Sequence, residues 1–234
     1  MALPKIKQPI FELTIPSTKE VVRYRPYTVS EEKLILIARE SEEVKDIIGA
    51  YKQIINNCFV DIKDVDKLAY FDLEYIFLML RSKSVSNVLE LSVTDDEDGK
   101  VYKVNLDLDR DIEVSNTETN NLIKLTDPIS VLLKYPSYEI LSSIAINGNR
   151  SVDSVLSIIR DCIEQIYDGE TAYDVAEYSK IDLDNWLMSL STKDLAKMQE
   201  FFSKLPKVTA KISYKRKDGS IRELTLEGIQ SFFG

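Results

Sequence analysis

The spacing between apolar residues changes several times along this chain of 234 residues, and each change predicts a new element. The first stretch alternates apolar and polar positions, with a Pro-Ser-Thr break near its middle and apolar residues at Phe11, Leu13, Ile15, Val22 and Tyr24. Alternate side chains of a strand lie on one face of a sheet, so a spacing of two is typical of a half-buried strand. The stretch therefore predicts an opening β-hairpin.

Apolar residues three and four positions apart predict amphipathic helices further along the chain. The helices predicted in this way cover residues 30–38, 44–58, 152–166 and 191–205. Ser30 is the predicted N-cap of the first helix, because its hydroxyl can accept a hydrogen bond from a free backbone N–H and two glutamates follow it. Ser191 is expected to open the last helix and Pro206 to end it.

The segment FDLEYIFLMLRSKSV, residues 71–85, predicts a helix of another kind. Its apolar run, residues 75–80, leaves no polar face, so this helix needs protein on nearly every side. Arg81 and Lys83 follow the run and complement the negative end of the helix dipole. We expect these cations to reach an acidic neighbour such as residues 107–113.

Two stretches predict β-hairpins around an Asp-Gly turn. The first covers residues 89–108, and strands near 112–114 and 122–125 are expected to extend it. The second covers residues 212–226. Three basic residues, 215–217, lie beside the second turn, and we interpret them as a solvated hairpin tip, with a phosphate site as the alternative.

Together these patterns predict an α+β protein in which antiparallel hairpins and small sheets pack with about five or six amphipathic helices. A cluster of Asn, Gly and Asn at residues 147–149 predicts a break in the chain. We therefore expect two subdomains. Residues 1–146 would form an N-terminal α+β domain, and residues 147–234 a helical region that ends in a hairpin.

The composition is that of a soluble globular protein, with 44% hydrophobic and 29% charged residues. The formal net charge of -9 argues against nucleic-acid binding, because neutralising phosphates requires a surplus of Lys and Arg. The first ten residues contain no apolar signal core, and no stretch is long enough to span a bilayer, so we expect no membrane insertion. Cys58 and Cys162 fall on apolar helical stripes and predict buried thiols in a reducing cytoplasm.

The chain contains no histidine, which removes the commonest acid-base group, every Ser-His or Cys-His pair and the usual zinc ligand. Neither glycine-rich phosphate-binding pattern occurs, and a calcium-loop alignment at residues 95–99 puts Thr94 and Asn105 at ligand positions. We expect no catalytic residue, no metal site and no cofactor. A glycosidase that uses two carboxylates is the enzymatic alternative.

Aromatic residues are frequent, with 12 Tyr and 8 Phe, and several tyrosines lie beside prolines or at the ends of elements. Such tyrosines are either amphipathic interface anchors or core residues whose hydroxyl reaches the surface. The candidate interaction residues are Tyr24, Arg25, Tyr27, Arg81, Lys83, Tyr135, Tyr138, Phe232 and Phe233.

Six segments occur in an order and spacing that carry a resemblance. They are FELTIPSTKEVVRYRPYTVSEEKLILIA, IINNC, FDLEYIFLMLRSKSV, LKYPS, FFSKLP and LTLEGIQSFFG. Through them the chain resembles the baseplate hub protein family of T4-type contractile-tail bacteriophages. Relatives often carry paired cysteines in the final hairpin, suggestive of a zinc knuckle. Here that hairpin reads SYKRKDGSIRELTLEG, so the resemblance implies no metal site in this chain.

The resemblance implies a late phage protein, either a hub subunit or a hub-assembly factor, that works through protein contacts and not through a reaction. Its partners would be other baseplate hub or tail proteins, and a homo-oligomer is left open. It would be found in the host cytoplasm during assembly and in the tail baseplate of the virion. One alternative is a transient assembly chaperone that is absent from the finished particle, and a more distant one is a cell-wall glycosidase.

Overall fold

The computed structural model describes residues 4, 6–41, 43–117, 119–141, 152–228 and 231–232. Contacts between Cα atoms divide the chain into two compact units. The first unit comprises Met1–Val65, Phe71–Ser115 and Lys207–Gly234, and the second comprises Asp66–Tyr70 and Asn116–Pro206. Both units combine helices with antiparallel strands, which confirms the predicted α+β class.

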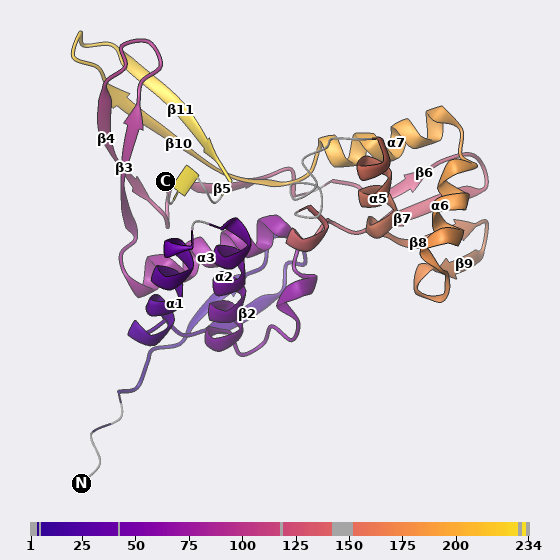
Figure 1. The fold of residues 1–234 in the computed structure, drawn as a ribbon, viewed down its shortest axis with the longest axis horizontal. Coiled ribbons are helices and arrows are strands. Elements are labelled where there is room, and N and C mark those ends of the chain that lie inside the picture. Colours follow the sequence, from indigo (N-terminus) through magenta and orange to yellow (C-terminus); the bar gives the residue numbers. More distant parts are fainter. Residues whose placement is uncertain are drawn as a thin grey trace. The chain divides into compact units, whose positions relative to one another are not determined.

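In the part of the chain that the structure describes, the first unit combines helices α1, α2 and α3 with three small groups of strands (Figure 1). Its elements are β1 (Phe11–Thr14), β2 (Val21–Tyr24), α1 (Val29–Glu40), α2 (Val44–Cys58), all but the first residue of α3 (Tyr70–Ser84), β3 (Val88–Thr94), β4 (Val101–Asp107), β5 (Ile112–Ser115), β10 (Lys207–Lys215) and β11 (Ile221–Glu227). A 3-10 turn, Val65–Lys67, precedes α3. The opening hairpin, the helix over residues 44–58 and both Asp-Gly hairpins are confirmed.

The strands after the first Asp-Gly hairpin do not extend it, contrary to the sequence prediction. The β3–β4 hairpin forms a two-stranded sheet, whereas β5 pairs with β10 in a sheet of order β11-β10-β5. In that sheet Ile112 lies opposite Ala210, a residue almost a hundred positions further along the chain. Alternation identifies a strand, but it does not show with which strand it pairs.

The first helix is capped two residues earlier than predicted. Thr28 is the N-cap, with extended backbone angles, and α1 begins at Val29. The Thr28 N–H donates to Oε2 of Glu31 over 2.7 Å. Ser30 therefore lies inside the first turn, where its hydroxyl is 2.9 Å from that of Thr28. The glutamate three residues after Thr28 was the sequence signal for this cap.

Helix α3 is buried on nearly every side, as its sequence predicted. Every residue from Phe71 to Leu80 is buried except Tyr75, which is half-buried. At its end the Lys83 ammonium lies 2.6 Å from Oδ2 of Asp109, and Ser82 donates to the other oxygen over 2.9 Å. The expected contact between the cationic end of this helix and the acidic stretch is confirmed for Lys83.

The second unit is built on a four-stranded antiparallel sheet of order β6-β7-β8-β9. Its elements are β6 (Leu122–Lys124), β7 (Ile129–Leu133), α5 (Val152–Cys162), β8 (Ile163–Asp168), β9 (Thr171–Asp174), a 3-10 turn (Val175–Glu177), α6 (Lys180–Met188) and α7 (Thr192–Ser203). The cap of α7 by Ser191 is confirmed, because its hydroxyl accepts from the Asp194 N–H. The sequence analysis did not predict α6.

The helix predicted over residues 152–166 is shorter than expected. Helix α5 ends at Cys162, and Ile163 begins β8, which lies between β7 and β9. Ile163 and Ile166 are still buried, with Ile166 opposite Val131 of β7. Their spacing of three fits both a helix and this strand's burial pattern, so apolar spacing could not locate the end of the helix.

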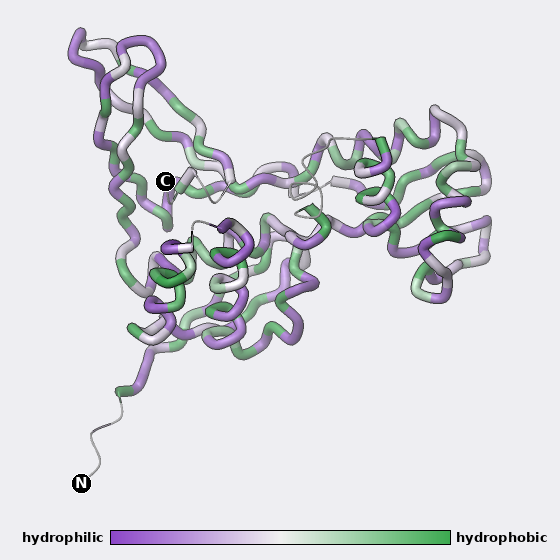
Figure 2. Tube along the Cα trace, viewed as in Figure 1, coloured by the Kyte–Doolittle hydropathy of each residue, from purple (hydrophilic) through white to green (hydrophobic). Residues whose placement is uncertain are grey.

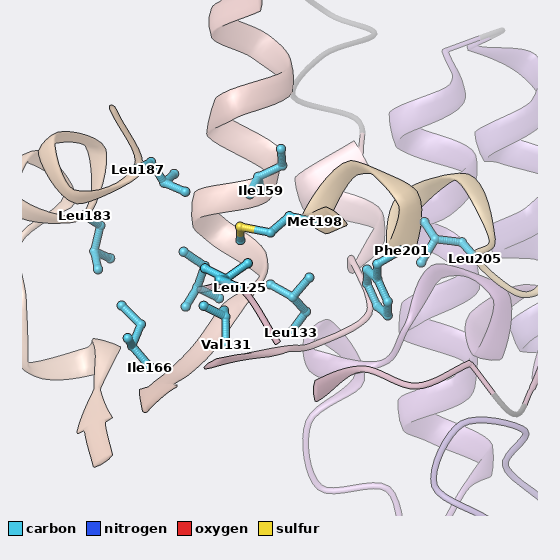
Figure 3. Close-up of a cluster of buried hydrophobic side chains, with 11 residues drawn as sticks. Leu125, Val131, Leu133, Ile159, Ile166, Leu183, Leu187, Met198, Phe201 and Leu205 are labelled. Carbon is cyan, nitrogen blue, oxygen red and sulfur yellow. The ribbon is translucent and has the colours of Figure 1, made fainter. Parts of the chain in front are cut away.

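The core of the second unit lies between the sheet and the helices α5, α6 and α7 (Figure 3). Side chains from β7, β8, α5, α6 and α7 point toward one another around Met198, which is fully buried. The buried residues of this core are Leu125, Val131, Leu133, Ile159, Ile163, Ile166, Leu183, Leu187, Met198, Phe201 and Leu205. All of them belong to one continuous stretch of the chain.

The predicted boundary between residues 146 and 147 lies outside the described residues, as does the Asn-Gly-Asn cluster beside it. That boundary stays a prediction. The second unit includes residues on both sides of it, because β7, which precedes it, pairs with β8, which follows it.

Candidate interaction groove

A groove of about 690 Å³ lies in the first unit, between its helices and the strands β3 and β11. Helices α1, α2 and α3 lie together beside β2 in Figure 1. The residues lining the groove are Tyr27, Glu32, Ile35, Leu36, Arg39, Tyr51, Phe77, Arg81, Val85, Leu89, Glu90, Leu91, Ser92, Val93, Leu224, Leu226, Ser231 and Phe232. Grooves of this volume are in the range that proteins use to bind partners or ligands.

The floor of the groove is aromatic and rigid. Tyr27, Tyr51, Phe77 and Phe232 are all buried, and the rings of Tyr51 and Phe77 stack with their centroids 3.7 Å apart. Burial raises the pKa of both Tyr27 and Tyr51 to about 12, although nearby Arg81 opposes the shift. Both hydroxyls therefore stay protonated and uncharged at neutral pH.

The walls of the groove expose apolar side chains. Leu36 of α1 is 56% exposed, Val85 after α3 is 54% exposed and Leu224 of β11 is 39% exposed. The lining also includes acidic and basic residues, with Glu32 and Arg39 from α1, Arg81 from α3 and Glu90 from β3. An apolar centre with a charged rim is the usual arrangement of a protein interface.

Three of the residues predicted from the sequence meet at this groove. Tyr27 and Phe232 form part of its buried floor, and Arg81 lines its side. Phe233 lies outside the described residues. The sequence could not show that these residues come together, since Tyr27 and Phe232 are separated by almost the whole chain.

Three other predicted residues make contacts within the first unit, and their role in binding a partner stays a prediction. Tyr24 is buried, and its ring stacks on Phe59 with centroids 4.9 Å apart. The Arg25 guanidinium donates to Oε1 of Glu31 over 2.8 Å and to the Asn57 carbonyl. Lys83 is paired with an aspartate, as described for α3. The polar and apolar parts of these side chains contact other residues of the first unit.

Tyr135 and Tyr138 belong to the second unit and are half-buried there. The Tyr135 ring stacks on Phe201 of α7 with centroids 5.7 Å apart. Part of each ring is accessible, so both tyrosines remain candidates for contact with a partner.

The basic run at the second hairpin tip is not simply solvated, contrary to the sequence interpretation. Arg216 donates from Nε to Oδ2 of Asp95 and from Nη1 to Oε2 of Glu97, both over 2.7 Å. Arg222 pairs with the same Glu97, and the Tyr214 hydroxyl donates to Asp95. These bonds, Arg216 first among them, hold the pKa of Asp95 well below its usual range. The two Asp-Gly hairpins are therefore joined near their tips, which lie side by side in Figure 1 and are mostly hydrophilic in Figure 2.

The enzymatic alternative, a glycosidase, would depend on the acidic residues. Such an enzyme needs a carboxylic acid with a raised pKa facing a second carboxylate. The pKa is lowered at Glu31, Asp61, Asp95 and Asp194. Hydrogen bonds and cations favour the charged form at these positions.

Cys58 and Cys162 are both buried free thiols, as the sequence predicted. Burial raises their pKa values to about 11 and 12, so neither is a reactive thiolate at neutral pH. Within the residues that the structure describes, no three His, Cys, Asp or Glu side chains are grouped so that they could hold a metal ion. Of the described helices, none has the length and apolar character needed to cross a lipid bilayer.

The sequence analysis missed the exposed apolar residues of the groove walls. A signal was present in α1, where Leu34, Ile35, Leu36 and Ile37 follow one another. Four consecutive apolar residues on a helix cannot all face one core, so some must be exposed. Leu36 and Ile37 are 56% and 54% exposed. The local sequence gave no comparable signal for Val85 or Leu224.

Comparisons with known proteins identify the family. Residues 8–234 match the family described as the T4 bacteriophage base plate protein. A comparison with curated proteins found no match, and neither did a comparison with solved structures. Because the match covers nearly the whole chain and both structural units, this protein belongs to the T4 bacteriophage base plate protein family.

Proposed function

We propose that this protein is a structural subunit of the baseplate hub and that it acts by binding other baseplate or tail proteins, without catalysing a reaction. Family membership over residues 8–234 supports a structural role in the baseplate. The hub position rests on the resemblance of the sequence to hub proteins. On this proposal the protein assembles in the host cytoplasm and is retained in the tail of the virion.

The observation that carries the binding role is the groove of the first unit. It combines a rigid aromatic floor, exposed apolar walls and a rim of mixed charge, which are features of a preformed interface. We propose that an apolar segment of another baseplate protein occupies it. The acidic and basic residues of the lining would then set the orientation of that segment.

Mass spectrometry of purified virions tests retention in the particle. A hub subunit is expected in a fixed ratio to other baseplate proteins in every preparation. If the protein is required for tail assembly but is absent from finished particles, it is an assembly chaperone and the subunit proposal fails. Clearing of a cell-wall gel by the purified protein would contradict the non-enzymatic role.

Two neighbouring residues of α1 provide a matched test of the groove. Leu36 lines the groove and Ile37 does not, although both are just over half exposed. We expect Leu36→Asp to reduce the yield of infectious particles about ten-fold or more in phage that depend on the variant, because a charge would be buried at the interface. Ile37→Asp is expected to leave the yield near the wild-type level.

Both variants should unfold at urea concentrations close to that of the wild-type protein, because each replaces an exposed side chain. Equal yields from Leu36→Asp and wild-type phage would exclude the groove as the interface. Equal losses from both variants would assign the effect to α1 as a whole.

A further inference from the structure

A second pocket, with a volume of about 590 Å³, lies in the second unit between its sheet and α6. Its lining residues come from β7, β8, β9, the turn before α6 and α6 itself. They are Ile129, Ile166, Asp168, Tyr173, Tyr178, Asp182, Leu183 and Trp186. None of these residues was among the candidate interaction residues predicted from the sequence.

The walls of the pocket are largely aromatic. Tyr173 is 38% exposed and Tyr178 is 44% exposed, while Trp186 is half-buried and packs on the core of the second unit. Leu183 and Ile166 at the base are both buried core residues. The pocket therefore presents open aromatic rings on a support that the core holds in place.

The charge around the pocket has one sign. The described lining residues include two carboxylates, Asp168 and Asp182, and no lysine or arginine. Residues 163–184 contain the acids Glu164, Asp168, Glu170, Asp174, Glu177, Asp182 and Asp184, whereas their single base is Lys180. The Lys180 ammonium lies 3.9 Å from Asp161, which does not line the pocket.

The two carboxylates of the pocket differ in their hydrogen bonds and ion pairs. Asp182 accepts hydrogen bonds from the Ser179 N–H and hydroxyl through one oxygen, because it is the third residue of α6, in the capping box in which Ser179 caps that helix. Asp168 forms no ion pair with any other residue that the structure describes. An exposed carboxylate beside open aromatic rings attracts a cation twice, through its own charge and through the negative faces of the rings.

We propose that this pocket binds an arginine side chain carried by an apolar segment of a partner protein. A planar guanidinium can stack on Trp186 or the tyrosines while it donates two hydrogen bonds to Asp168, which a lysine ammonium cannot do in the same way. The volume exceeds that of one side chain, and the apolar base accommodates neighbouring aliphatic residues of the segment. This pocket is separate from the groove of the first unit, so the inference does not depend on the hub role.

Trp186 is the only tryptophan in the chain, so its fluorescence reports directly on the pocket. The full-length protein would be titrated with the peptide acetyl-Ser-Leu-Arg-Leu-Ser-amide, which has no aromatic residue. A second peptide would carry citrulline, the neutral isostere of arginine, and two others would carry lysine or glutamate at that position. We expect a saturable change in fluorescence with the arginine peptide, and an affinity about three- to ten-fold lower with the citrulline peptide.

Variants separate the charge of the pocket from its rings. Asp168→Asn should lower the affinity for the arginine peptide about three- to ten-fold and leave the affinity for the citrulline peptide unchanged. Tyr178→Ala should lower the affinity for both peptides. Tyr178→Phe, which keeps the ring, should lower the affinity for neither. Glu200→Gln removes the same charge from a side chain that is 61% exposed in the second unit and does not line this pocket, so it should change nothing. Unchanged far-UV circular dichroism would show that each variant is folded.

Equal affinity for the arginine and citrulline peptides would overturn the proposal, since the pocket would then recognise only apolar surface. No fluorescence change with any peptide, or tighter binding of the glutamate peptide, would overturn it as well. Equal affinity for the lysine and arginine peptides would overturn the choice of guanidinium. Loss of the Asp168→Asn effect at high salt would support the proposal, because the attraction of exposed charges is screened by salt.

Discussion

Glu31 is a buried acid that holds together the start of α1 and the preceding strand. Its side chain is 7% exposed and accepts hydrogen bonds from the Arg25 guanidinium and from the Thr28 N–H. Burial by itself raises the pKa of Glu31, but the hydrogen bonds outweigh it and lower the pKa to about 2. One residue thus caps a helix and neutralises an arginine that the sequence had offered as a partner contact.

We predict that Glu31→Gln lowers the free energy of unfolding by about 1–3 kcal/mol at neutral pH, because the partly buried Arg25 loses its charged partner. Glu32→Gln, an exposed acid next to it, should change this free energy by less than about 0.5 kcal/mol. Urea denaturation followed by far-UV circular dichroism measures both. Equal effects of the two substitutions would show that the Glu31 contacts contribute nothing.

The lowered pKa of Glu31 also predicts how stability depends on pH. The folded pKa of Glu31, about 2, lies below the unfolded value of about 4.3, so its contribution is complete above about pH 4.3 and is lost as the pH falls toward 2. Wild-type protein should therefore lose more stability than Glu31→Gln between about pH 4.5 and pH 2.5. Parallel pH profiles for the two proteins would contradict the lowered pKa.

At the scale of elements, two glycines differ in the backbone conformation that they adopt. Gly49 is exposed within α2, and Gly219 has φ of 92° in the turn between β10 and β11. No heavy atom lies within 4 Å of a Cβ built on either residue, so space does not distinguish them. The two differ because Gly219 lies in the left-handed region of backbone angles, which residues other than glycine rarely adopt.

We predict opposite signs for the same substitution at these two positions. Gly49→Ala should raise the free energy of unfolding by about 0.5–1 kcal/mol, because alanine loses less entropy in a helix. Gly219→Ala should lower it by about 1 kcal/mol through backbone strain. Urea denaturation of the two variants under one set of conditions compares them. Stabilisation by Gly219→Ala would contradict the positive φ of the turn.

Helix α5 offers a second comparison within one element. Ile159 is 1% exposed in the core of the second unit, and Val152 at the start of the helix is 74% exposed. Ile159→Ala should lower the free energy of unfolding by about 2–5 kcal/mol, since it leaves a cavity, and Val152→Ala should change it by less than about 0.5 kcal/mol. Trp186 fluorescence during urea unfolding follows this unit. A small effect at Ile159 would show that α5 does not pack as the structure places it.

Most elements could be predicted from the local sequence, and the errors have a common physical cause. Thr28 and Ser30 both carry a hydroxyl that could cap α1. Thr28 is the cap, with Glu31 three residues after it. Helix α6 was missed although Ser179 and Asp182 form a capping box at its start. Its apolar residues include the exposed Ile181, which obscures the spacing of a helix.

At the scale of the whole molecule, the second unit has a core that one continuous stretch supplies. The buried residues from Leu125 to Leu205 all lie within residues 116–206. The first unit, in contrast, needs residues from both ends of the chain, because β5 pairs with β10. The first unit is therefore assembled from segments at both ends of the chain, whereas the second unit is formed mainly by residues 116–206.

This difference predicts how fragments behave. Residues 116–206 expressed alone should unfold cooperatively and show the Trp186 emission of the full chain, because their core is complete. Residues 1–115 alone should be less protected from proteolysis than in the full chain, since β5 lacks its partner. Fragments cut between residues 146 and 147 should lose the second unit, because the cut separates β7 from β8. A cooperative fragment 147–234 would instead support the boundary predicted from the sequence.

The sequence by itself determined most of the elements of the first unit and the fold class of the protein. Local patterns such as the apolar run of α3 and the Asp-Gly turns depend on neighbouring residues, and so they can be recognised without a fold. The same is true of the segments that resemble baseplate proteins. They follow one another along nearly the whole chain, as the family match does.

Only the tertiary structure decided which residues act together. Tyr27, Leu36, Arg81 and Leu224 meet in one groove although they come from distant segments of the chain. Arg25 is paired within the first unit, because Glu31 reaches it across the first turn of α1. Burial and strand pairing depend on contacts between residues far apart in the chain, and these contacts leave no periodic signal in the local sequence.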